Sequence, residues 1–310
     1  TSEHNSNDLD YKSANALKLN EGKIKDFVGN DAILSLPEPG SDGSLGANKA
    51  IIIDNIGPSI KWVNSTTENG AYNSGDTVIV TVNLDENTLV TGTPQITFET
   101  GSTDGKANYT SGSGDTLLVF KFGIDSLHNT PKLKYLSSSA LELNSGTMKD
   151  AVGNNASLTL PTPGSANSLD ANKSITIDNI APVISLVAEG RADGVDTDYQ
   201  GSKTTLAISW LGTDSVSGIS KYEYALGTEP GNADIKNWHD TTVVNSAVIG
   251  GLSLWDANKY YVSIKATDKA GNVSAVKTGD GITIDLTAPI IGTVNDGIED
   301  DITATTSTTT

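Results

Sequence analysis

The chain has 310 residues, of which 36% are hydrophobic and only 5% aromatic, and 31 are glycine. This composition suits short strands joined by many turns, and the length predicts two or three domains. The 38 acidic residues outnumber the 20 basic ones and give a formal net charge of −18, which argues against binding to nucleic acid or to anionic lipid.

Cysteine is absent, so the domains have no disulfide and no thiolate metal site, and they depend on packing or on cations bound through oxygen. No window approaches eighteen consecutive apolar residues, so we expect no membrane insertion. The chain lacks a signal segment and does not begin with Met, which we interpret as an internal piece of a longer, exported protein. A cytosolic protein without cysteine is the alternative.

The sequence contains an internal repeat. Residues 11–60 align without a gap on residues 135–184, at a constant offset of 124, and 31 of these 50 positions are identical. Composition alone does not produce such identity at a fixed spacing, so the two segments are copies of one structural unit. Both copies close with Ile-Asp-Asn-Ile and then a proline, at residues 53–58 and 177–182.

A third closing sequence, residues 284–289, has the same four-residue step from Asp to Pro. Proline cannot donate to a sheet ladder, so each closing sequence marks the exit of a last strand. We therefore expect the C-terminal part of a repeat at 1–54, a complete repeat at 55–180, a different domain at 181–287, and the start of a further domain or a tail at 288–310. The short proline-containing linkers limit bending between neighbours.

Short half-buried strands are predicted in the complete repeat. Apolar and polar residues alternate over 77–84, 95–100 and 117–124, and clusters of Asn, Gly and Ser lie between these segments. Antiparallel strands with one buried face show this pattern. We expect a turn at Ser74-Gly75, because Ser and Gly favour chain reversal.

Four motifs of the complete repeat are informative together: a Ser74-Gly75-Asp76 turn, a Thr91-Gly92-Thr93-Pro94 step, a Ser111-Gly112-Ser113-Gly114 turn, and a closing strand at Ala171-Asn172-Lys173. With them, the repeat resembles the tandem bacterial immunoglobulin-like repeats of giant adhesins and other large exported proteins. The resemblance covers residues 1–180 and implies an extracellular or cell-surface location.

Residues 182–285 follow a different pattern. Trp210 ends an early strand, and Leu254 precedes the strand at 260–266 by six residues. This arrangement resembles a bacterial fibronectin type III-like domain, and the resemblance implies that Tyr260 hydrogen-bonds back to the backbone at the corner before the sixth strand. The predicted fold class is therefore all-β, with tandem immunoglobulin-like antiparallel β-sandwiches arranged as a rod.

Catalytic residues are hard to find in this sequence. The three histidines, His4, His128 and His239, are far apart, and none has a metal-ligand spacing or lies beside a nucleophile motif. Two acids could meet across a cleft as in glycoside hydrolases, but solvated acids that keep strand edges soluble explain the carboxylates more simply. We predict that the protein is not an enzyme.

A sharper signal is the turn Asp-x-x-Gly-Asn, which occurs at residues 26–30, 150–154 and 268–272. If it joins the last two strands of a sandwich, it lies at the pole where the closing Asp of the preceding domain arrives. Calcium takes six to eight oxygens in flexible geometry, which suits such converging loops. The predicted calcium ligands are Asp54, Asp150 and Asp85 or Glu86 at the first junction, and Asp178, Asp268 and Asp214 at the second.

The same turns also have a simpler explanation, because Asp caps local backbone and Gly or Asn supplies a positive φ. Turn chemistry explains less well why an Asp closes every domain. Bound calcium would cancel repulsion between the acids and stiffen the joint, and a resemblance to calcium-stiffened bacterial surface repeats implies the same. Both interpretations stay open at this point.

The predicted function is a structural extension, or stalk, of a large bacterial surface or secreted protein of the adhesin type. Its predicted partners are neighbouring repeats of the same polypeptide and, through a distal domain, a host or biofilm surface. One alternative is a carbohydrate- or ligand-binding module that uses Trp62, Trp238 and Trp255 to stack on sugars. Another is an accessory region of a secreted depolymerase.

Overall fold

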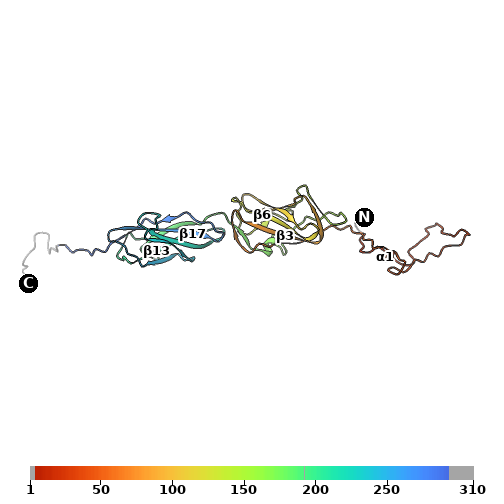
Figure 1. The fold of residues 1–310 in the computed structure, drawn as a ribbon, viewed down its shortest axis with the longest axis horizontal. Coiled ribbons are helices and arrows are strands. Elements are labelled where there is room, and N and C mark those ends of the chain that lie inside the picture. Colours follow the sequence, from red (N-terminus) through yellow and green to blue (C-terminus); the bar gives the residue numbers. More distant parts are fainter. Residues whose placement is uncertain (1–3, 192, 293–310) are drawn as a thin grey trace, which may run out of the picture. The chain divides into compact units, whose positions relative to one another are not determined.

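The computed structural model describes residues 4–191 and 193–292 (Figure 1). The chain divides into two compact units, Thr1–Asn179 and Ile180–Thr310, which we describe separately. Strands dominate both units, and the helices of the described residues are the single turns α1 (Leu45–Asn48) and α2 (Leu169–Asn172). The described residues contain no helix long and apolar enough to cross a membrane.

Unit 1 is built from ten strands. They are β1 (Ile60–Ser65), β2 (Gly70–Tyr72), β3 (Thr77–Thr91), β4 (Gln95–Glu99), β5 (Gly105–Ser111), β6 (Asp115–Gly123), β7 (Lys134–Tyr135), β8 (Leu141–Glu142), β9 (Thr147–Lys149) and β10 (Ile175–Ile177). An antiparallel sheet has the order β1-β3-β6-β5-β4-β7, and β8 and β9 pair with β4 and β3. β10 pairs with β2 in parallel.

The hydrophobic core of unit 1 lies among residues 63–177. Alternate residues of β3 and β6 point inward, so that Val80, Val82, Leu118 and Phe120 are fully buried. β10 and the loop after β9 contribute apolar side chains to the same cluster, including Leu160. Burial of each such side chain contributes roughly 1.5–3 kcal/mol to folding.

Most strand predictions for the complete repeat are confirmed. β3 covers the first predicted segment and continues past residue 84 to Thr91, and β4 and β6 each end one residue before the end of the predicted segment. Gly75 has a φ of 98°, as the predicted turn requires. The predicted closing strand at 171–173 is wrong, because the Ser168 hydroxyl accepts a hydrogen bond from the Ala171 N–H and caps the helical turn α2 there.

Unit 2 is a sandwich of two sheets around one core. Its strands are β11 (Val183–Glu189), β12 (Tyr199–Gln200), β13 (Thr205–Thr213), β14 (Ile219–Gly227), β15 (Lys236–Thr241), β16 (Ser246–Gly250), β17 (Lys259–Asp268), β18 (Lys277–Thr278) and β19 (Ile282–Ile284). One sheet has the order β11-β13-β16, the other β12-β19-β17-β14-β15, and β18 pairs with β17. Buried residues of β13, β14 and β17 meet in the core between them.

The predicted role of Tyr260 is confirmed. Its side chain is 1% exposed, and its hydroxyl accepts a hydrogen bond of 3.0 Å from the Trp255 N–H, five residues earlier. With these sheets and this corner, the fold class is an all-β immunoglobulin-like β-sandwich, as predicted. The arrangement as a rod and the finer division into four domains stay predictions.

The first repeat copy looks different from the second. The described residues 4–59 contain α1 and isolated bridges such as Ser6 with Ile53, but no strand. Phe27 and Ile33 are exposed there. The predicted start of a further domain lies, from residue 293 onward, outside the described residues.

Candidate metal centre

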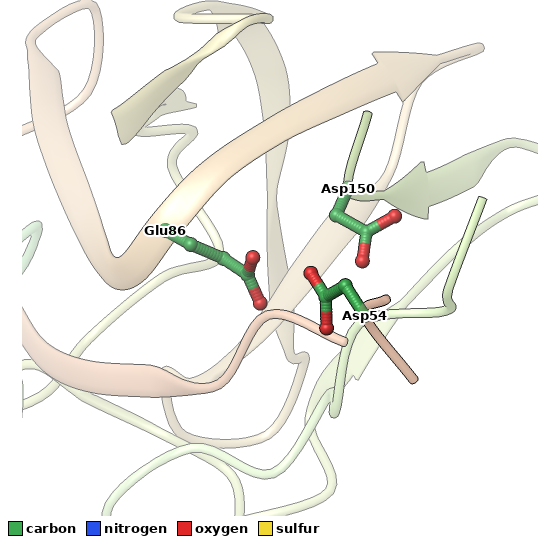
Figure 2. Close-up of side chains that lie close together, drawn as sticks. All are labelled: Asp54, Glu86 and Asp150. Atoms are coloured by element: carbon green, nitrogen blue, oxygen red, sulfur yellow. The ribbon is translucent and has the colours of Figure 1, made fainter. Parts of the chain in front are cut away.

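Three carboxylates from distant parts of unit 1 converge (Figure 2). Asp54 closes the first repeat copy, Glu86 lies in β3, and Asp150 directly follows β9. Each offers an oxygen within 4.8 Å of the others, and Asp150 is the most buried of the three at 4% exposure. Hard carboxylate oxygens at this spacing are the donor set that calcium prefers.

Asp150 is held in place by its own turn. Its Oδ1 accepts hydrogen bonds from the N–H groups of Val152, Gly153 and Asn154 at 2.6–2.9 Å, and its Oδ2 accepts one from the Asn154 side chain. Burial alone raises the pKa of Asp150, but these hydrogen bonds outweigh it and hold the pKa below its usual range. Asp150 is therefore a carboxylate at neutral pH. Its hydrogen bonds within the turn are those that the simpler turn explanation requires.

Glu86 has the opposite electrostatics. Burial raises its pKa, and the negative charges of Asp54, Asp150 and Asp85 raise it further. Like charges within about 5 Å repel one another, and a cation between them would remove that repulsion. The mutual repulsion is what the turn explanation does not account for.

Asp54 is tied to the Asp150 turn through its backbone. The Asn154 side chain donates a hydrogen bond to the Asp54 carbonyl at 3.1 Å, and the Ser157 N–H donates to the Pro58 carbonyl at 2.8 Å. Gly57 permits the close approach, because a Cβ there would lie 2.0 Å from the Asn155 carbonyl oxygen. The end of the first copy thus lies along the loop that follows β9.

Asp85 does not join this group. It accepts hydrogen bonds from the Ser59 N–H and hydroxyl at 2.7 and 2.6 Å and forms an ion pair of 2.9 Å with Lys61. Burial raises its pKa, but the Ser59 hydrogen bonds and then Lys61 outweigh this and lower it to about 2. Of the two residues proposed for this position, the structure places Glu86 beside Asp54 and Asp150.

The second predicted group divides between the two units. Asp178 follows β10 in unit 1, and its N–H donates to the Tyr72 carbonyl. Asp214 and Asp268 belong to unit 2, where their carboxylate oxygens lie within 4.8 Å of each other. Asp268 accepts two hydrogen bonds from Asn272, in the same turn geometry as Asp150. A joint calcium site of these three residues stays a prediction.

The Asp-x-x-Gly-Asn turn of the first copy serves as a comparison for the turn of Asp150. Asp26 accepts hydrogen bonds from Val28 and Asn30 just as Asp150 does in its turn, and Gly29 has a similarly positive φ of 98°. Among the described residues, however, Asp26 belongs to no group of three acids. The turn therefore forms without any carboxylate partner, and the neighbours of Asp150 are an additional feature.

Sequence reasoning missed one carboxylate group, formed by Glu189, Asp196 and Asp280 in unit 2. Glu189 occupies a fully buried position at the end of β11. The sequence carries no clear signal for this group, because burial does not alternate along β11 and no motif links the three positions.

The tryptophans of the carbohydrate alternative are spread over both units. In unit 2, Trp255 is 73% exposed, whereas the ring of Trp238 is covered by the ammonium group of Lys265 at 4.6 Å from its centroid. Trp62 lies in β1 of unit 1. The covered Trp238 ring has one face occupied by a cation, as in many surface cation–π pairs.

Comparisons with known proteins give structural similarity only. No family model matches the sequence, and a search of curated proteins gives no match. The crystal structure of domains A168–A170 from titin is similar at 10% identity and a TM-score of 0.39, and the match covers 78% of this chain and 73% of that chain. The FN1–FN3 domains of chicken CNTN1 are similar at 11% identity and a TM-score of 0.30, covering 74% and 66%. The fold assignment rests on the strand pairings above.

Proposed function

We propose that this chain is a structural spacer of a large bacterial surface or secreted protein of the adhesin type, stiffened by calcium. The observation that carries the proposal is the convergence of Asp54, Glu86 and Asp150. Asp54 closes the first repeat copy, whereas Glu86 lies in β3 and Asp150 directly follows β9, so a cation bound to all three ties the end of the first copy to the complete repeat.

The charge balance of the group favours a cation. Among the described residues, no Lys or Arg forms an ion pair with Asp54, Glu86 or Asp150, and Lys61 is paired with Asp85. Three carboxylates within 4.8 Å repel one another, and calcium accepts carboxylates together with carbonyls and water. Binding to the folded state alone also stabilises that state.

A spacer gains from stiffness at this position. Residues 55–58 are a short connection that ends in Pro58, which already restricts bending. A cation held by Asp54 on one side and by Glu86 and Asp150 on the other removes the remaining freedom of this connection. The repetition of nearly the same fifty residues favours a role in extending the protein over a catalytic role.

Thermal unfolding of the full chain tests the calcium ligands. With millimolar calcium, the melting temperature should rise over that in excess chelator, because a hundredfold excess over Kd stabilises the folded state by about 2.7 kcal/mol. Asp150→Asn should lose much of this rise, and the matched turn variant Asp26→Asn should keep it. Equal calcium responses of the two variants would count against the site.

A further inference from the structure

Glu189 is a buried acid with one unsatisfied oxygen. Its side chain is 0% exposed, and its Oε1 accepts a long hydrogen bond of 3.3 Å from the Val262 N–H. Its Oε2 is buried and has no hydrogen-bond partner among the described residues. A buried carboxylate oxygen without a partner is costly, so this position calls for a further ligand of Glu189.

The surrounding backbone is shaped around this carboxylate. A Cβ at Gly279 would lie 2.1 and 2.2 Å from the two Glu189 oxygens, so only glycine leaves room for them. The Gly279 N–H donates to the Val262 carbonyl at 3.0 Å, which fixes this close approach. The Glu189 carboxylate at the end of β11 thus fills the space that Gly279 leaves.

Two further acids lie at the same place. Asp196 and Asp280 each offer an oxygen within 4.8 Å of Glu189 and of each other, and both are exposed. Asp196 is held there because its Oδ1 accepts a hydrogen bond of 2.7 Å from the Glu189 N–H. Asp280 lies between β18 and β19.

Within residues 4–191 and 193–292, no basic residue neutralises the three acids. Arg191 forms its ion pair with Asp193, and the Lys259 ammonium lies over the Tyr261 ring, 5.7 Å from its centroid. Among the described residues, no Lys or Arg forms an ion pair with Glu189, Asp196 or Asp280. The group is therefore open to a cation from solution.

We propose that Glu189, Asp196 and Asp280 bind a calcium ion inside the second unit. The ion completes the unsatisfied Oε2 of Glu189, and water or backbone carbonyls complete its shell. It ties the loop after β11 and the connection between β18 and β19 to the body of the sandwich. This site shares no ligand with Asp54, Glu86 and Asp150, so it goes beyond the spacer function.

A bound proton is the competing occupant. Burial, followed by the charges of Asp196 and Asp280, raises the pKa of Glu189 to about 7, although the backbone N–H groups of Val262 and Gly281 oppose this rise. A lone proton satisfies Glu189 but leaves two neighbouring acids unneutralised. The two occupants are distinguishable at one fixed pH, because only the bound calcium depends on the calcium concentration.

A calcium chloride titration of the full chain at pH 8, followed by backbone amide NMR, tests the site. The amide of Val262, which hydrogen-bonds to Glu189, and the amide of Gly281, which follows Asp280, should shift and saturate. Glu189→Gln should abolish these shifts, while Asp193→Asn, an acid of the same loop paired with Arg191, should keep them. The amides of 152–154 report the first site separately, so failure of one site is read independently of the other.

A second variant guards against misfolding of Glu189→Gln. Asp280 is exposed, so Asp280→Asn should fold normally and lower the calcium affinity read at Val262 by about tenfold or more, because it removes one charged ligand. Absent shifts at Val262 and Gly281 in the wild type, or unchanged affinity in Asp280→Asn, would overturn the proposal.

Discussion

The two repeat copies share most of their sequence but not their environment. Leu169 and Ile175 of the second copy are 0% and 1% exposed, whereas the equivalent Leu45 and Ile51 of the first copy are 37% and 38% exposed. Local features are nevertheless the same in both. Each copy has a helical turn capped by a serine, at Ser44 and at Ser168, and each has an Asp-x-x-Gly-Asn turn.

The difference arises from the strands that precede the second copy. The Asn172 side chain donates to the Val63 carbonyl of β1 at 2.8 Å, and the Val63 N–H donates to the Asn167 carbonyl. The second copy thereby closes the core of β3 and β6. Turns and caps follow from local sequence, whereas burial needs the complementary sheet, which the described residues 4–59 do not contain.

Truncation of equivalent leucines in the two copies should give the largest difference between them. Leu169→Ala should lower the free energy of unfolding of unit 1 by roughly 2–5 kcal/mol, since it leaves a cavity in a closed core. Leu45→Ala at the equivalent half-exposed position should cost less than about 1 kcal/mol. Urea unfolding followed at the amides of β3 and β6 measures both, and equal costs would break the comparison.

A smaller effect on stability is expected at Ser59, where the two copies differ in sequence. Ser59 of the first copy donates two hydrogen bonds to Asp85, whereas its equivalent in the second copy is Val183, which has no hydroxyl. The folded-state pKa of Asp85, about 2, is below its ordinary value, so its contribution is present above about pH 4 and is lost as the pH falls toward 2.

Asp85→Asn should therefore destabilise unit 1 at neutral pH and have little effect near pH 2. The cost should be no more than about 1 kcal/mol, because this carboxylate is more than a third exposed and solvent screens its charge. Urea unfolding of the variant and the wild type at both pH values measures the difference. A difference that persists unchanged at pH 2 would show that lost packing, rather than charge, is responsible.

Much of the fold could be predicted from periodicity and turn chemistry. The alternation of apolar and polar residues at 77–84 predicted β3. The expectation that sandwich loops meet at one pole predicted that Asp54 and Asp150 lie close together. The choice between Asp85 and Glu86 could not be made, since neighbouring strand residues point to opposite faces and the pairing of β3 with β6 is irregular between Asn83 and Thr88.

Two other features were beyond sequence reasoning for different reasons. The helical turn at Leu169–Asn172 depends on the Ser168 cap, which overrode the expected strand. The Glu189 group combines a strand end, a loop and a later connection between strands, and no shared motif marks these three positions. Tertiary packing alone brings them together.

The proposed spacer depends on calcium that ties the end of the first copy to the complete repeat. Because the chain has no cysteine, spin labels can be placed at Asp42→Cys and Ser102→Cys, two exposed positions of unit 1, and the distribution of distances between them can be measured. We expect a narrower distance distribution with calcium than with chelator, and no narrowing in Asp150→Asn. Distributions of equal width with and without calcium would contradict this proposal.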